Sequence, residues 1–83
     1  MNPRVQDVEP LPGYRLQLRF ANNELKIFEC LPFLDFGVFS SLRDINYFNQ
    51  VKVLDGTVVW PGEQDICPDT LYVDSIAIAT IST

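Results

Sequence analysis

The sequence predicts an α+β fold in which a small antiparallel sheet, built from two β-hairpins plus a first strand, packs with one short helix and a C-terminal helical turn. Three observations carry this prediction: strict apolar alternation in residues 14–20, the turn dipeptide Asp55-Gly56 between two apolar runs, and a helix-capping serine at Ser41. The 83 residues, 47% of them hydrophobic and 20% charged, suit a single compact domain over 1–83.

The first hairpin follows a short strand predicted at 5–9, which the prolines and glycine of residues 10–13 should end. In residues 14–20 every second side chain is apolar, so one face of that strand should be buried. Asn22-Asn23 tolerates positive φ and predicts a two-residue loop into a strand at 24–29. This register places Leu18 opposite Ile27 on the buried face, and Arg19 opposite Lys26 on the wet face.

The middle of the chain should form an irregular connection and then a helix. Residues 31–37 are rich in aromatics but contain proline and glycine, which favours a buried, irregular segment. Ser41 with Asp44 three residues later resembles a capping box and predicts a helix to about Asn49. The apolar residues of this helix recur every three positions and should form a buried stripe: Leu42, Ile45 and Phe48.

The second hairpin is predicted from Asp55-Gly56, the strongest short turn signal, with Val53 opposite Val58 and Val51 opposite Trp60. Its other face, which carries Lys52, Leu54, Thr57 and Val59, is only partly polar. We expect either the helix or another subunit to cover that face.

The C-terminal part should contain one helical turn within 65–72, where proline and aspartate occupy positions that a first turn favours. The tail at 76–83 alternates apolar and small residues, so it either adds an edge strand or frays.

The composition argues against an enzyme. The chain has no histidine, which is the usual general base near neutral pH and the commonest metal ligand. The candidate nucleophiles lack an activating basic neighbour: Ser40, Ser41, Cys30 and Cys67. Asp65 and Asp69 could share a helix face and hold a metal, but helix capping explains them better. We therefore expect no catalytic residues, no cofactor and no metal.

The charge distribution disfavours direct nucleic-acid binding, because the net charge is −5 and the six basic residues are spread along the chain. Beyond Lys52 the only charged residues are acids. The residues after Met1 include no apolar signal region, and no run reaches the length of a membrane span. A cytoplasmic protein with two reduced cysteines is the expectation.

Several motifs resemble the family known as domain of unknown function 2442, and the resemblance spans nearly the whole chain. They are the early hairpin, Leu42-Arg43-Asp44 with Phe48-Asn49-Gln50-Val51, Val58-Val59-Trp60-Pro61, and the segment from Asp65 to Tyr72. The Trp-Pro dipeptide and the Asp65 to Tyr72 segment are the specific part. One departure is Asn22-Asn23, where the family often has Asp-Gly or Asn-Gly. The resemblance implies a small α+β fold without an established enzymatic activity.

The same resemblance implies a genomic context, since such proteins are often encoded beside another small protein in toxin–antitoxin-like pairs, and some are fused to a helix-turn-helix domain. The leading hypothesis is thus a non-catalytic protein-binding module, an antitoxin-like partner of a small basic protein encoded nearby. Four residues are candidates for contacting that partner: Trp60, Asp65, Asp69 and Tyr72. Core packing of Trp60 is the competing interpretation. Homo-oligomerisation is left open.

The alternative function is a regulatory or small-ligand-sensing domain, associated with a helix-turn-helix regulator. In that case the aromatic residues of 33–39 together with Trp60 would line a small apolar pocket.

Overall fold

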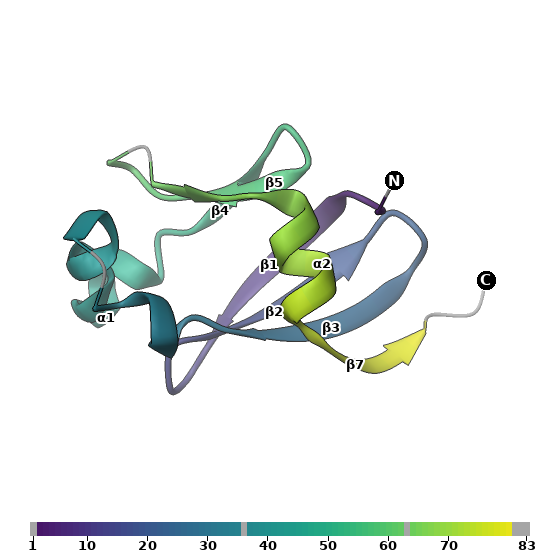
Figure 1. The fold of residues 1–83 in the computed structure, drawn as a ribbon, viewed down its shortest axis with the longest axis horizontal. Coiled ribbons are helices and arrows are strands. Elements are labelled where there is room, and N and C mark those ends of the chain that lie inside the picture. The colour runs from purple at the N-terminus through teal and green to yellow at the C-terminus, as the bar shows by residue number, and fades with distance from the viewer. Residues whose placement is uncertain (1, 36, 63, 81–83) are drawn as a thin grey trace.

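Two antiparallel sheets enclose one hydrophobic core in the computed structural model, which describes residues 2–35, 37–62 and 64–80 (Figure 1). The larger sheet has the strand order β1-β2-β3-β7 and the smaller one the order β4-β5-β6. The α+β class is confirmed, although the strands divide between two sheets instead of forming one. Their bounds are β1 (Val5–Leu11), β2 (Arg15–Phe20), β3 (Glu24–Glu29), β4 (Lys52–Leu54), β5 (Thr57–Val59), β6 (Asp65–Ile66) and β7 (Ile76–Thr80).

The first strand is longer than predicted, because β1 continues through Pro10 to Leu11 instead of ending at Glu9. Its register with β2 places Pro10 opposite Leu16 and Leu11 opposite Arg15. Proline lacks a backbone N–H, but β1 is an edge strand, where a missing donor can be tolerated.

The predicted register of the first hairpin is wrong by one residue. Leu18 lies opposite Lys26 and Arg19 lies opposite Leu25. The loop comprises residues 21–23, and only its last residue, Asn23, has a positive φ, of 68°. This is the pattern of a three-residue hairpin loop with a left-handed final residue. Since side chains alternate between faces, the one-residue difference turns Lys26 toward the core and its two apolar neighbours away from it.

The connection after β3 consists of two 3₁₀ helices, η1 (Leu31–Phe33) and η2 (Gly37–Arg43). The segment was predicted to be buried, but the structure buries only part of it: Leu34 is buried, whereas the side chain of Leu31 is 55% exposed. Phe36 lies outside the described residues. Proline inside the segment leaves room for short 3₁₀ turns but not for a regular strand.

Helix α1 (Ile45–Phe48) begins later than predicted, and its cap is Asp44, not Ser41. The Asp44 carboxylate accepts a hydrogen bond from the backbone N–H of Asn46 at 3.0 Å, which satisfies one of the free donors of the first turn. Leu42 and Phe48 are buried, whereas Ile45 is 44% exposed, so the predicted stripe of three residues is reduced to two.

The second hairpin agrees with the prediction at its turn and in one of the two predicted pairs. Val53 lies opposite Val58, and Asp55 and Gly56 both have positive φ, 52° and 80°, as a type I′ turn requires. The predicted pairing of Val51 with Trp60 is not observed, because the ladder ends with Lys52 opposite Val59. Val51 precedes β4, and Trp60 follows β5.

The C-terminal segment begins with a strand instead of the predicted helical turn, and it ends in an edge strand, which was one of the two outcomes expected for the tail. Asp65 and Ile66 form β6, and helix α2 (Pro68–Asp74) follows. The two aspartates therefore do not share a helix. Of the two outcomes left open for the tail, the edge strand is the one observed: β7 pairs with β3, and residues 81–83 lie outside the described residues.

The core lies between the two sheets and is closed by the helices. It combines inward residues of the large sheet with Val58 and Ile66 of the small sheet and Leu71 of α2. The Trp60 ring is 1% exposed and lies 6.0 Å from the Phe48 ring, so the core interpretation of this residue holds. Within the described ranges, no helix is long and apolar enough to cross a membrane.

Candidate protein-binding face

The large sheet has an outer face, on the side away from the core, that divides into a charged half and an apolar half. The strand register defines both halves: rows across the sheet join Asp7, Arg19 and Leu25, and then Glu9, Gln17, Ile27 and Ile76. The charged half lies on β1 and β2, and the apolar half lies on β3 and β7. We call the set formed by Leu25, Ile27 and Ile76 the apolar row.

The apolar row is incompletely covered. Leu25 and Ile27 are half-buried, and Ile76 is 68% exposed. Ile78, on the same edge strand, is 53% exposed. In Figure 1, α2 and the small sheet lie on the opposite side of the large sheet, so among the described elements none packs over this row. Single exposed apolar residues are ordinary, but adjacent ones on two neighbouring strands form a patch.

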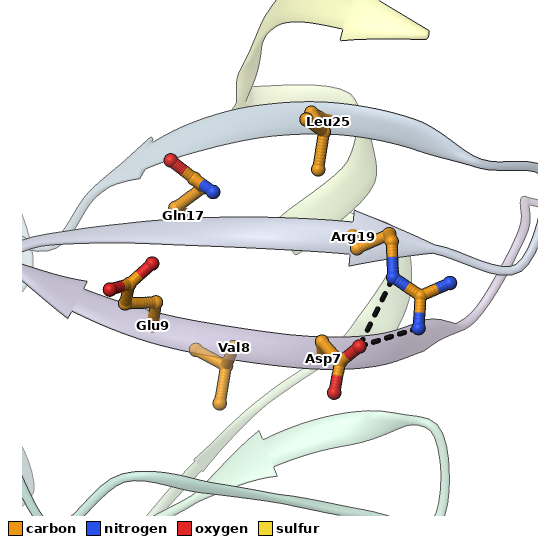
Figure 2. Close-up of a pocket in the computed structure, with 6 residues that line it drawn as sticks. All are labelled: Asp7, Val8, Glu9, Gln17, Arg19 and Leu25. Carbon is orange, nitrogen blue, oxygen red and sulfur yellow. Dashed lines mark hydrogen bonds and ion pairs between the residues drawn. The ribbon is translucent and has the colours of Figure 1, made fainter. Parts of the chain in front are cut away.

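A hollow of about 490 Å³ lies where the two halves of the outer face meet. Figure 2 shows its lining, which comprises Asp7, Val8, Glu9, Gln17, Arg19 and Leu25. The Arg19 guanidinium donates to the Asp7 carboxylate, with Nε 3.1 Å from Oδ2, and it also donates to the Gln6 side chain at 2.9 Å.

Glu9 is the acidic residue of this hollow whose negative charge is not balanced by a nearby basic side chain. Within the described residues its carboxylate makes no ion pair, whereas Asp7 is already compensated by Arg19. Glu9 lies beside Gln17 on the neighbouring strand, on the other side of the hollow from the ion pair (Figure 2). A cationic side chain entering here would meet an uncompensated carboxylate, with an apolar surface next to it.

The predicted contact residues are not gathered in one place. Trp60 lies in the core, where its indole N–H donates to the Phe48 carbonyl at 2.9 Å. Trp60 and the exposed Asp65 line one hollow of about 320 Å³, whereas Asp69 lines another, of about 250 Å³. Asp69 accepts a hydrogen bond from Asn2 at 3.3 Å. The partner-binding role of these residues stays a prediction.

Tyr72 takes part in a polar cluster that fastens α2 to β3. Its hydroxyl donates to Glu24, and the Lys26 ammonium donates to the Tyr72 carbonyl and lies 3.9 Å from the centre of the Tyr72 ring. The hydrogen bond from Tyr72, followed by one from Asn22, lowers the pKa of Glu24, and the same bond raises the pKa of Tyr72. The one-residue shift in register thus gives the inward-facing Lys26 a partner on the helix.

The cysteines differ in their surroundings, and both are free thiols. Burial, with the nearby Glu29 charge, raises the pKa of Cys30 to about 12, so its thiol stays protonated near neutral pH. Cys67 is exposed at the start of α2. Among the described residues, no group of three or more potential ligands is arranged to hold a metal ion.

The apolar row was missed from the sequence because the assumed two-residue loop placed Leu25 and Ile27 in the core. The signal that could have exposed the error is Ala21, which together with Asn22-Asn23 makes a three-residue loop possible.

Comparison with known proteins places the chain in a family but supplies no activity. A family model described as "Protein of unknown function (DUF2442)" matches residues 5–77. No curated protein and no solved structure matches the chain.

Proposed function

The chain belongs to this family of proteins of unknown function, and we propose that it is a non-catalytic protein-binding module that uses the outer face of its large sheet to hold a small basic partner. The observation that carries the proposal is the apolar row beside a hollow with an uncompensated carboxylate. Burial of such a row by a partner is favourable in proportion to the apolar area removed from water. The neighbouring charges would determine which partner is accepted.

The preference for a basic partner follows from the charges. The chain has a net charge of −5, and three of its basic residues are already engaged by acids: Arg15 with Glu29, Arg19 with Asp7, and Arg43 with Asp35. On the outer face, Glu9 is available to a lysine or arginine whose aliphatic stem could lie on Leu25. The predicted contact residues Asp65 and Asp69 are exposed and add to the negative field, which would speed association with a cationic protein.

More specifically, we propose that the chain acts like an antitoxin in the cytoplasm. Its partner would be a small protein encoded nearby. The test is coexpression of the chain with the product of the neighbouring gene, followed by co-purification at low salt. We expect a complex, and we expect the neighbouring protein to be toxic when it is expressed alone. A neighbour that neither binds nor harms the cell would remove the antitoxin role.

Variants of the outer face locate the contact. Replacing Ile27 and Ile76 by glutamine should abolish the complex, since both lie in the apolar row and neither is fully buried. The matched control is Val73→Gln, which changes an exposed apolar residue of α2, 66% exposed, away from the outer face. Equal loss of binding in both variants would contradict the assignment of the face.

Replacing either of two acidic residues by its amide distinguishes direct contact with the partner from long-range electrostatic attraction. Glu9→Gln should increase the dissociation rate, because it removes the carboxylate that lines the hollow. Asp69→Asn should mainly slow association and weaken its dependence on salt, because Asp69 lies on α2 and contributes to the field. The reverse pattern would move the contact to the α2 side, where the predicted residues Asp69 and Tyr72 lie.

The alternative of a ligand-sensing domain has less support. Two of the rings expected to line a pocket contact other rings instead: Phe33 lies 6.1 Å from Phe39 in an edge-to-face arrangement, and 5.5 Å from the core residue Phe28. Trp60 does line a hollow, but its companions there are Lys52, Leu54, Val59, Pro61 and Asp65, not the aromatic segment.

A further inference from the structure

The outer side of the small sheet carries one positive and one negative charge on either side of an apolar centre. The register places Lys52 of β4, Val59 of β5 and Asp65 of β6 in one row across the three strands. These side chains point away from the core, because the alternate residues Val58 and Ile66 are buried in it. We call the surface formed by Lys52, Leu54, Val59 and Asp65 the β5 face.

The β5 face is open and its charges are unsatisfied. Lys52 and Asp65 are exposed, and neither makes an ion pair or side-chain hydrogen bond within the described ranges. Leu54 is 50% exposed, and a hollow of about 320 Å³ lies over this surface. Strands lie about 4.8 Å apart, so the two charges are separated by about 10 Å across Val59. Because Lys52, Leu54 and Asp65 are exposed, the described helices do not cover this face. Of the two coverings expected from the sequence, the helix is therefore not the one observed, and another subunit stays a prediction.

We propose that the β5 face binds the β5 face of a second copy of this chain, in a two-fold dimer whose axis runs parallel to β5 through Val59. A rotation about that axis places Lys52 of each copy over Asp65 of the other and brings the two Val59 side chains together. The face is thus its own complement, as a symmetric dimer requires. Aligned packing of two sheets is a common arrangement for such faces.

The charge pattern distinguishes a second copy from other partners. A basic protein on this face would approach Lys52, and an acidic protein would approach Asp65, so each would leave one like-charge contact. Only a partner with the opposite order of charges across the row satisfies both, and the chain itself has that order. This site is separate from the outer face of the large sheet, which lies on the other side of the core and stays free in the dimer (Figure 1).

The dimer should be weak. The face is only three short strands wide, so the area that it could bury is well below the roughly 800 Å² per partner of a standard stable interface. In addition, two chains of net charge −5 repel each other. We expect a dissociation constant on the order of 0.1 mM, as is reasonable for a small transient interface.

Charge reversal tests the arrangement, with self-association measured by sedimentation equilibrium up to about 1 mM protein. In Lys52→Glu, both pairs become Glu opposite Asp, and in Asp65→Lys, both become Lys opposite Lys. Each substitution acts twice in a symmetric dimer, so each should weaken self-association at least about tenfold. An equimolar mixture of the two variants should associate again, because both cross-pairs in the mixed dimer are then of opposite sign. The double variant K52E/D65K should also form a homodimer.

The matched controls are Arg43→Glu and Asp74→Lys, which change the net charge equally at exposed positions outside the β5 face. They should leave the dissociation constant within about threefold of the original value. Far-UV circular dichroism checks that the variants fold. A chain that is monomeric at 1 mM, a dimer indifferent to the reversals, or a mixture that stays monomeric would each overturn the proposal; indifference would point to pairing through the β7 edge instead.

Discussion

Replacing Trp60 with phenylalanine should cost the protein a large share of its stability. The indole is 1% exposed and its N–H donates to the Phe48 carbonyl at 2.9 Å. Loss of this buried hydrogen bond costs about 1 kcal/mol. The phenyl ring also has two fewer carbon atoms than the indole, which removes about 2 kcal/mol of burial free energy at about 0.8 kcal/mol per methylene-sized group. The sum, about 3 kcal/mol, compares with a total of about 4 to 12 kcal/mol for a domain of 83 residues.

Urea denaturation measures this loss, with far-UV circular dichroism as the signal because Trp60 is the only tryptophan. With a slope of about 1 kcal/mol per molar urea, the midpoint should fall by about 3 M. Val73→Ala is the control, since its side chain is 66% exposed and the change should stay within about 0.5 kcal/mol. A Trp60→Phe midpoint equal to that of the control would refute the placement of the indole in the core.

Three further outcomes follow from individual contacts. The hydrogen bond from Tyr72 lowers the pKa of Glu24 in the folded protein. The stability that this bond contributes is therefore present above the pKa of Glu24 in the unfolded chain, and it is lost as the pH falls through the pKa in the folded protein. Tyr72→Phe should flatten the decline of stability that an acid titration shows below about pH 4.5. Gly56→Ala should destabilise the protein by about 1 to 2 kcal/mol, because φ there is +80°, whereas Gly37→Ala has open space around the added carbon and should lack that penalty in the same urea titration. In a thiol-reagent assay of the native protein, the exposed cysteine should react and Cys30, with its pKa raised to about 12, should not; fast labelling of both would contradict its burial.

Local turn chemistry made the second hairpin predictable from the sequence. Asp55-Gly56 supplies two residues that accept positive φ, which fixes both the loop length and the pairing of Val53 with Val58. The edge strand at the tail was foreseen only as one of two outcomes, because its formation depends on β3, which is distant in the sequence.

The helical parts were predicted less well, because competing caps differ by little free energy. Ser41 and Asp44 are both good N-caps, and the structure uses Asp44, which shortens the helix to Ile45–Phe48. Asp65 was assigned to a helical turn, but it pairs with Val59 as part of β6. That pairing is a long-range interaction, which overrides the local preference of an acid for a helix start.

The outer face of the large sheet could not be predicted from local signals, because it depends on one residue of loop length. With a two-residue loop, Leu25 and Ile27 would enter the core and Lys26 would face the solvent. With the observed three-residue loop, Lys26 faces the core and its two apolar neighbours face outward. A lysine directed inward is normally unfavourable, but Lys26 finds the Tyr72 carbonyl and ring on α2. The contact that accommodates the lysine comes from a helix far away in the chain. The same contact therefore helps fix the register that leaves the apolar row exposed, and a binding surface of this kind can be recognised only after the tertiary fold is known.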